Sequence, residues 1–254
     1  MKSPLFSIIP AIALAALSHA GTVAHWQFND LNDSSGNGHH LTNNNTVASL
    51  GGGRLNFSST TATGLVSTPD SAAWDDTSFT LEAIVSVSST TSLTSIVTHM
   101  TNGTDGRQWF FGTSETGVPI VIINPSSGTE ARITSTFTGL TAGTNYYLGL
   151  SLNLGAASAA DRVTFYLRDL SVPDSPFQIS PGSTNFTGFA ASSAVLAIGS
   201  TGHSSSRLNG SIDEIRFSDT NLALNELLVA VPEPSLAALS AIGLASLGLR
   251  RRRA

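Results

Sequence analysis

The sequence predicts an all-β domain, an antiparallel β-sandwich or jelly roll, from three observations. Apolar and polar residues alternate at period two, as in Phe79–Val87, where five apolar side chains fall on one strand face. Clusters of Gly, Asn, Asp, Pro and Ser separate many short runs of this kind. No helical pattern alternates with these runs, so a parallel sheet with crossover helices is not expected.

The alternating runs predict the individual strands in chain order. One early strand contains Trp26, and a later one contains Phe165. The other expected strands are Ser95–His99, Gln108–Gly112, Pro119–Ile123, Arg132–Thr136, Tyr147–Asn153, Val195–Gly199 and Gly210–Phe217. After the last strand, Asn221 is expected to cap a short helix whose apolar side is formed by the leucines of Leu222–Leu228.

Composition limits the classes of function. The 254 residues suit one domain, and the lack of cysteine excludes disulfides, Cys-based zinc sites and thiol catalysis. Charged residues make up only 11%, and the stretch 21–230 holds seven arginines, no lysine and sixteen acids, a formal net charge of −9. Nucleic acid is therefore not expected as a partner, because phosphate binding needs clustered Lys and Arg.

The first twenty residues are typical of a secretory signal peptide. Lys2 supplies the positive start, and the apolar stretch Leu5–Leu17 is too short for a usual membrane span. Small residues at Ser18 and Ala20 place the expected cut after Ala20. The alternative is an uncleaved anchor. The expected division of the chain is a signal peptide at 1–20, one domain at 21–230 and a tail at 231–254.

The tail has three parts. A Pro-Glu-Pro motif precedes the apolar run Ser235–Leu249, which spans only ~22 Å as a helix against a hydrocarbon core of ~30 Å. The motif is Val231, Pro232, Glu233 and Pro234, and the closing arginines are Arg250, Arg251, Arg252 and Arg253. This tail resembles the PEP-CTERM sorting signal of Gram-negative bacteria. The resemblance implies recognition by an exosortase-type enzyme, transient contact with the inner membrane, and delivery to the cell surface or extracellular matrix; the alternative is an ordinary tail anchor.

Several stretches of the middle resemble the laminin G-like, concanavalin A-like jelly roll of bacterial surface proteins. They are Val23–Phe28 with the turn Asp33–Gly38, then Phe79–Ala83, Ala142–Leu148, Asn209–Phe217 and Leu222–Leu228. The resemblance implies a jelly roll, and the two end segments add an N-terminal signal helix and a C-terminal apolar helix on either side of it. It also implies that the closing strand lies beside the opening one, near the Asp33–Gly38 turn.

That juxtaposition suggests a calcium site. By strand alternation, Asp213 is expected on the same apolar face as Ile215 and Phe217, where a carboxylate needs a cation or several hydrogen-bond donors. Calcium takes carboxylate and carbonyl oxygens in loops. The expected ligands are Asp33, Gly36, Asn37 and Asp213. The alternative is that each carboxylate accepts hydrogen bonds from nearby backbone amides.

Catalysis is not expected. Asp213 and Glu214 are neighbours in a strand, so they point to opposite faces and cannot act together as acid and base. No nucleophile elbow, phosphate loop or dinucleotide motif is present. The pair His39–His40 lacks Cys or carboxylate support for a transition metal and is expected in a solvated loop.

The expected function is therefore an exported, non-catalytic surface or matrix protein that binds carbohydrate or another extracellular polymer. Exposed aromatic rings commonly contact sugars. Trp74, Trp109, Tyr146 and Tyr147 are the candidates, although the same rings are also expected to pack at the ends of a sandwich. The alternatives are a secreted polysaccharide-active enzyme on the same fold and a structural coat protein without a defined ligand.

Overall fold

The computed structural model describes residues 21–58, 64–100, 107–126, 128–201 and 206–229. The expected signal peptide, the sorting motif Val231–Pro234 and Arg250–Arg253, and the two flanking apolar helices lie outside the described residues. Among the described residues there is no helix long and apolar enough to cross a membrane.

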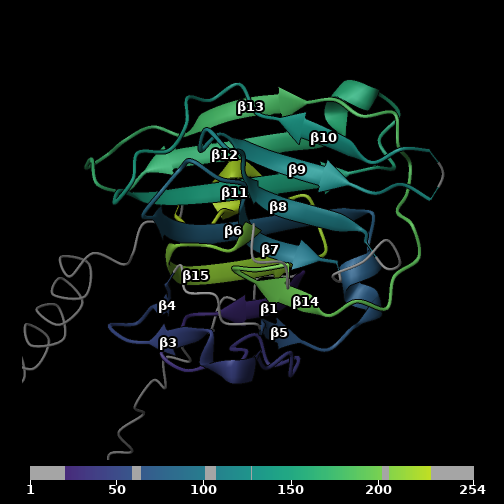
Figure 1. Ribbon diagram of the computed structural model, residues 1–254. Helices are drawn as coiled ribbons and strands as arrows, with labels where there is room; N and C mark the ends of the chain where they lie inside the picture. Colours follow the sequence, from purple (N-terminus) through teal and green to yellow (C-terminus); the bar gives the residue numbers. More distant parts are fainter. Residues whose placement is uncertain (1–20, 59–63, 101–106, 127, 202–205, 230–254) are drawn as a thin grey trace, which may run out of the picture.

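Two antiparallel sheets form the domain, which confirms the prediction of a β-sandwich (Figure 1). The first sheet runs β13 (Gln178–Gly182), β12 (Val163–Asp169), β11 (Asn145–Asn153), β6 (Ser78–Val87), β15 (Gly210–Ser218), β4 (Leu55–Phe57) and β3 (Ala48–Leu50), with β1 (Thr22–Trp26) also paired to β15. The second runs β10 (Ala131–Thr134), β9 (Pro119–Ile123), β8 (Trp109–Thr113), β7 (Thr94–His99), β14 (Leu196–Ile198), β5 (Val66–Thr68) and β2 (Thr42–Asn43). Short 3-10 turns include η1 (Asn44–Thr46), η2 (Ala72–Asp75), η3 (Ala159–Asp161) and η5 (Leu224–Glu226).

The core lies between the two sheets and follows the predicted alternation. Phe79, Leu81 and Ala83 of β6 are fully buried, and the inward residues of β11 and β12 are buried with them. Phe217 packs against three rings, with centroid distances of 4.9 Å to Phe79, 5.2 Å to Trp74 and 6.2 Å to Trp109. Burying each large apolar side chain contributes about 1.5–3 kcal/mol to the stability of the fold. Because the chain has no cysteine, its stability comes from this core rather than from disulfides.

A β-bulge in β15 changes which side chains point inward. The register with β6 shifts between Ile212 and Glu214, so Asp213 is the extra residue. Ile212 and Ile215 are both fully buried, whereas the Asp213 side chain is 40% exposed and lies 3.8 Å from Arg54. The expectation that Asp213 shares the apolar face with Ile215 is wrong, because strict alternation does not continue through a bulge.

The segment after β15 is held against the outer face of the first sheet by a buried carboxylate. Glu82 accepts hydrogen bonds from the Tyr147 hydroxyl at 2.9 Å, the Leu228 amide at 2.7 Å and Arg216 Nε at 2.6 Å. Arg216 in turn donates to the Glu226 carbonyl at 2.6 Å. Burial and the adjacent Glu82 carboxylate raise the pKa of Tyr147 well above its ordinary value, so its hydroxyl stays a donor.

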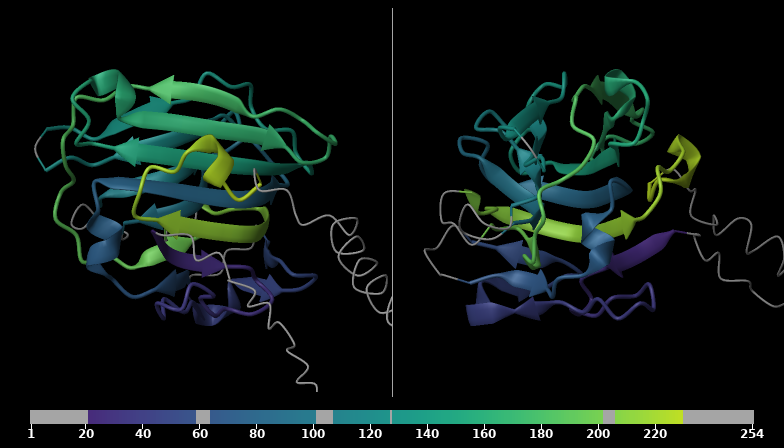
Figure 2. Two further views of the ribbon diagram at one scale, coloured as in Figure 1. Left: turned by 180° about the vertical axis from the view of Figure 1, so that it is seen from behind. Right: turned by 90° about the vertical axis from the view of Figure 1, so that its right-hand side faces the viewer.

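We call Leu222–Val229 the C-terminal segment. Figure 2 shows it, in yellow, lying across the sheet. It contains the 3-10 turn η5 rather than the expected longer helix. Asn221 does not cap it; the Asn221 amide instead donates to Ser151 Oγ at 2.7 Å and the Leu152 carbonyl at 2.8 Å. Arg168 donates to the Val229 carbonyl at 2.9 Å, which fixes the last described residue on this face.

Candidate functional site at one end of the sandwich

Four polar side chains from distant parts of the chain meet at one end of the sandwich. Asp70 follows β5, Asp75 ends η2, His99 ends β7 and Gln108 precedes β8. Figure 1 shows η2, in blue, at this right-hand end, beside the long green connection from β13 to β14. We call these four residues the His99 cluster. The sequence alone does not predict it, because none of the four residues belongs to a local motif.

Two buried tryptophans hold the loop that carries the aspartates. The Trp74 indole nitrogen donates to the Pro69 carbonyl at 3.1 Å, and the Trp109 indole nitrogen donates to the Trp74 carbonyl at 3.0 Å. Ser71 caps η2, where its side chain accepts a hydrogen bond from the Ala73 amide at 3.3 Å. Residues 69–75 are therefore fastened to the core at several points.

Hydrogen bonds connect the members of the His99 cluster directly. His99 Nδ1 lies 3.0 Å from Gln108 Oε1, and Gln108 Nε2 donates to Asp75 Oδ1 at 2.5 Å. His99 Nε2 lies 2.9 Å from the Ala194 carbonyl oxygen and 3.3 Å from Asp70 Oδ1. A continuous network thus joins the two aspartates through a histidine and an amide.

Exposure differs sharply across the cluster. His99 is fully buried and Gln108 is 3% exposed, whereas the side chains of Asp70 and Asp75 are 38% and 43% exposed. No described residue bonds the second carboxylate oxygen, Oδ2, of either aspartate. Ionised carboxylates are pure acceptors, so the cluster presents oriented acceptor atoms to groups that donate, such as hydroxyls.

The Asp33 turn lies elsewhere and is saturated by its own donors. Asp33 Oδ1 accepts from the amides of His25 and Ser35, both at 2.9 Å. Oδ2 accepts from the Ser35 hydroxyl at 2.8 Å and the His39 amide at 3.0 Å. Burial alone raises the pKa of Asp33, but these hydrogen bonds outweigh burial and hold the pKa below its ordinary value.

The four predicted calcium ligands do not share a common set of partners. Asn37 donates its amide to the carbonyls of Thr22 and Val23, Gly36 adopts a positive φ of 92°, and Asp213 lies beside Arg54. Among the described residues, no group of three or more His, Asp or Glu side chains is arranged so that it could hold a metal ion. Calcium binding therefore stays a prediction, and the effect of chelation on the melting temperature is its test.

The histidine pair lies in the irregular stretch after this turn, where His40 is exposed and His39 is partly buried, in line with the expected loop. The His39 ring lies 4.7 Å from that of Trp74, and its carbonyl accepts from the Trp26 indole at 2.8 Å. His40 Nδ1 accepts from the Asp33 amide at 3.1 Å. These contacts make both histidines structural parts of the turn.

The four aromatic candidates for sugar contact all lie inside the domain. Trp74, Trp109 and Tyr147 are fully buried, and Tyr146 is 9% exposed. They follow the alternative expectation, in which the rings pack within the sandwich. These four rings therefore cannot stack on a sugar. Any sugar that the domain binds has to be recognised through hydrogen-bonding groups instead.

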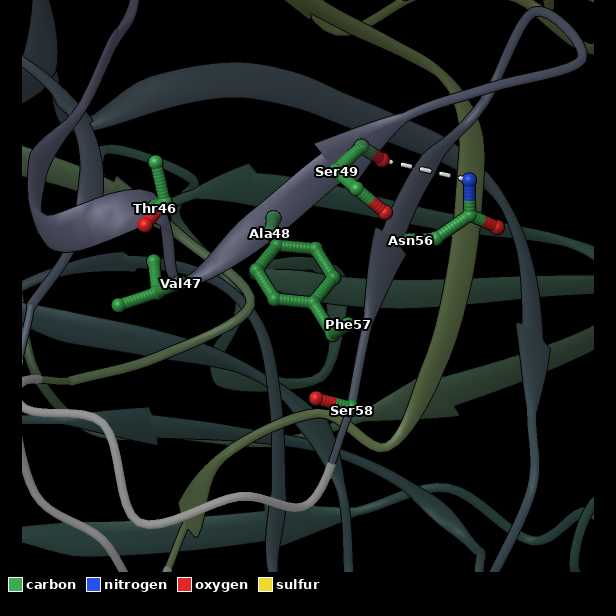
Figure 3. A pocket seen from close by; sticks show the side chains of 7 residues that line it. All are labelled: Thr46, Val47, Ala48, Ser49, Asn56, Phe57 and Ser58. Carbon is green, nitrogen blue, oxygen red and sulfur yellow. Dashed lines mark hydrogen bonds between the residues drawn. The ribbon is translucent and has the colours of Figure 1, made fainter.

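A small pocket lies at the edge of the first sheet, between η1, β3 and β4 (Figure 3). Its volume is about 220 Å³, and Ser49, Asn56 and Phe57 are among its lining residues. The Asn56 amide is already engaged by the Ser49 carbonyl at 3.3 Å. Pockets for small molecules usually measure about 300–1,000 Å³, so this one is too small to be the preferred site.

Solved structures share this architecture, while no protein-family model and no curated protein matches the chain. Domain 4 of AbnA, a GH43 extracellular arabinanase from Geobacillus stearothermophilus, in complex with arabinotriose, is 19% identical with a TM-score of 0.53; the match covers 84% of this chain and 99% of that one. The chain has the β-sandwich fold of that domain. The likeness extends to the fold alone at this level of identity.

Two further structures match at similar levels. The binding domain of Paraclostridial Mosquitocidal Protein 1 is 14% identical with a TM-score of 0.54, covering 80% of this chain and 50% of that one. Trypanosoma rangeli sialidase is 14% identical with a TM-score of 0.53, covering 81% of this chain and 32% of that one. The β-sandwich thus occurs both as a separate domain and as part of larger proteins.

Proposed function

We propose that this chain is an exported, non-catalytic surface or matrix protein whose β-sandwich binds carbohydrate at the His99 cluster. The observation that carries the proposal is the pair of half-exposed carboxylates, Asp70 and Asp75, oriented by a buried histidine and a buried amide. Sugar hydroxyls are the donors that such acceptors fit. The arabinotriose complex of the similar domain supports this choice of ligand class.

Export and surface delivery are supported by the two ends of the sequence. Met1–Ala20 fits a signal peptide, and the tail of Val231–Pro234 with Arg250–Arg253 fits sorting by an exosortase-type enzyme. These features support a location among extracellular polysaccharides. The stretch 21–230 has a net charge of −9 and no lysine, which favours neutral over polyanionic polymers.

A polysaccharide-active enzyme is the second candidate, because two carboxylates in one site are the equipment of glycoside hydrolysis. Such an enzyme needs one carboxyl group that donates a proton to the leaving oxygen. Asp75 instead accepts from Gln108, and Asp70 faces His99 Nε2. This arrangement suits two ionised acceptors, so binding without turnover is the preferred proposal.

The test is retention of purified protein on immobilised neutral polysaccharides, with reducing ends measured in the same samples. Asp70→Ala and Asp75→Ala should each weaken retention about tenfold, equal to ~1.4 kcal/mol. Glu115→Ala is the matched control, since Glu115 is an exposed acid whose side chain pairs with Arg132. It should leave retention unchanged.

Three results would count against the proposal. Equal retention of the two aspartate variants and the wild type would move the binding site away from the His99 cluster. If the wild-type protein is retained on none of the polymers, a structural coat protein without a defined ligand is the remaining function. Release of reducing ends that stops in Asp70→Asn or Asp75→Asn would make the protein an enzyme.

A further inference from the structure

Both ring nitrogens of His99 face hydrogen-bond acceptors. Nε2 lies 2.9 Å from the Ala194 carbonyl oxygen, which can only accept, and 3.3 Å from Asp70 Oδ1. Nδ1 lies 3.0 Å from Gln108 Oε1. A neutral imidazole has one N–H and one bare nitrogen, so it can satisfy only one of these two sides. The fully buried ring leaves no solvent to satisfy the other.

The orientation of the Gln108 amide decides whether His99 Nδ1 carries a proton. Its Nε2 donates to Asp75 Oδ1 at 2.5 Å. Turning the amide over would bring two acceptors, Gln108 Oε1 and the Asp75 carboxylate, into contact. The amide oxygen therefore has to face His99, and His99 has to donate from Nδ1 as well as from Nε2.

We propose that His99 is a doubly protonated imidazolium that acts as a positioning residue, holding Asp70 and Asp75 as ionised acceptors for sugar hydroxyls. Its charge is balanced within the cluster, since Asp70 Oδ1 lies 3.3 Å from Nε2 and Asp75 Oδ1 lies 3.8 Å from Nδ1. Without both partners a buried cation would be strongly unfavourable.

The ligand chemistry follows from this charge state. Two aspartates and one imidazolium leave the cluster with a formal charge of −1. Uronate or sialate groups are therefore repelled, while neutral sugars with adjacent hydroxyls are accepted. This part of the inference rests on the proposed function; the protonation of His99 does not.

The direct test is nitrogen-15 NMR of the histidine rings in the wild-type protein at pH 7. We expect both His99 nitrogens to carry protons and to give the signature of an imidazolium. His40 is the internal control, because its Nδ1 accepts a hydrogen bond from the Asp33 amide and must be bare. One bare nitrogen on His99 would overturn the proposal.

A binding measurement separates this proposal from the proposed function. His99→Gln can donate on only one side, so retention on neutral polysaccharide should fall about tenfold, equal to ~1.4 kcal/mol. Unchanged retention in a folded His99→Gln protein would contradict the positioning role. Doubly protonated His99 in a protein that binds no sugar would overturn the proposed function and leave the charge assignment standing.

Discussion

The buried network of Glu82, Tyr147 and Arg216 allows single hydrogen bonds to be removed one at a time. Tyr147→Phe deletes the hydroxyl that donates to the Glu82 carboxylate at 2.9 Å. Because this bond involves a charged acceptor, we expect the free energy of unfolding to fall by about 1.5–3 kcal/mol. Urea denaturation measures the change.

The matched control is the neighbouring tyrosine. The Tyr146 hydroxyl accepts from the Thr141 amide at 3.3 Å, a weaker contact between neutral groups, so Tyr146→Phe should cost only about 0.5–1.5 kcal/mol. If both variants lose the same stability, the Glu82 carboxylate is not the reason that Tyr147 matters.

The lowered pKa of Asp33 predicts how the stability of the fold depends on pH. Its pKa in the folded state lies below the ordinary value of 3.8, so it stabilises the fold above that pH. This contribution disappears as pH falls below 3.8 and through the lower folded pKa. Asp33→Asn should therefore be less stable at pH 7, and its stability should decline less steeply between neutral pH and strong acid.

The measurement is guanidinium denaturation of both proteins across that pH range. Asp169→Asn serves as a control, because the Asp169 carboxylate at the end of β12 accepts from the amide and hydroxyl of Ser171, two residues along the chain. Parallel pH profiles for the wild type and Asp33→Asn would contradict the stabilising role of the Asp33 carboxylate.

Sequence reasoning at the residue scale succeeded where partners are neighbours in the chain. The alternative in which Asp33 bonds its own turn follows from Asx-turn chemistry, and the structure has this arrangement. The expected position of Asp213 on the apolar face was wrong, because the period-two pattern of apolar and polar residues gives no sign of a bulge. The His99 cluster was missed because residues 70 and 194 meet residue 99 only in the folded chain.

At the scale of elements, the C-terminal segment is held by apolar burial as well as by polar contacts. Leu227 is fully buried in a cluster with Tyr147 and Leu222, whereas Leu224 is 41% exposed. We expect Leu227→Ala to destabilise the domain by about 2–5 kcal/mol through the cavity it leaves. Leu224→Ala should change stability by less than about 0.5 kcal/mol.

Thermal melting measures the stability of both variants. Limited proteolysis of the segment gives a second measurement, since a loosened segment is cut before the sandwich is. Equal melting temperatures for the two variants would mean that the segment adds nothing to the stability of the sandwich.

Some strands are long enough to show the period-two alternation of apolar and polar residues, and others are too short to show it. Pro119–Ile123 was predicted with the observed bounds, and β6, β11 and β15 with small errors at their ends. The four strands between Thr42 and Thr68 were missed. They contain only two or three residues each, too few for alternation to show.

At the scale of the whole molecule, the sequence determined the fold class because alternation and turn residues agree along most of the chain. We propose that the two ends carry a different kind of information, an address rather than a fold. We expect the mature protein to begin at Gly21 and to lack Arg250–Arg253. Intact-mass measurement of surface material checks both ends, and retention of the arginines would contradict sorting at the Pro-Glu-Pro motif.

The attachment of Val229 also determines how the domain carries mechanical load. A pull applied at residue 229 would enter through the Arg168–Val229 bond and the Leu228–Glu82 bond, and so would reach β12 and β6, neither of which is an edge strand. The Asp219 amide, bonded to the Gly21 carbonyl at 2.8 Å, ties the start of the domain to the same region. Force applied at residue 229 would therefore be shared by several hydrogen bonds at once rather than concentrated on one strand.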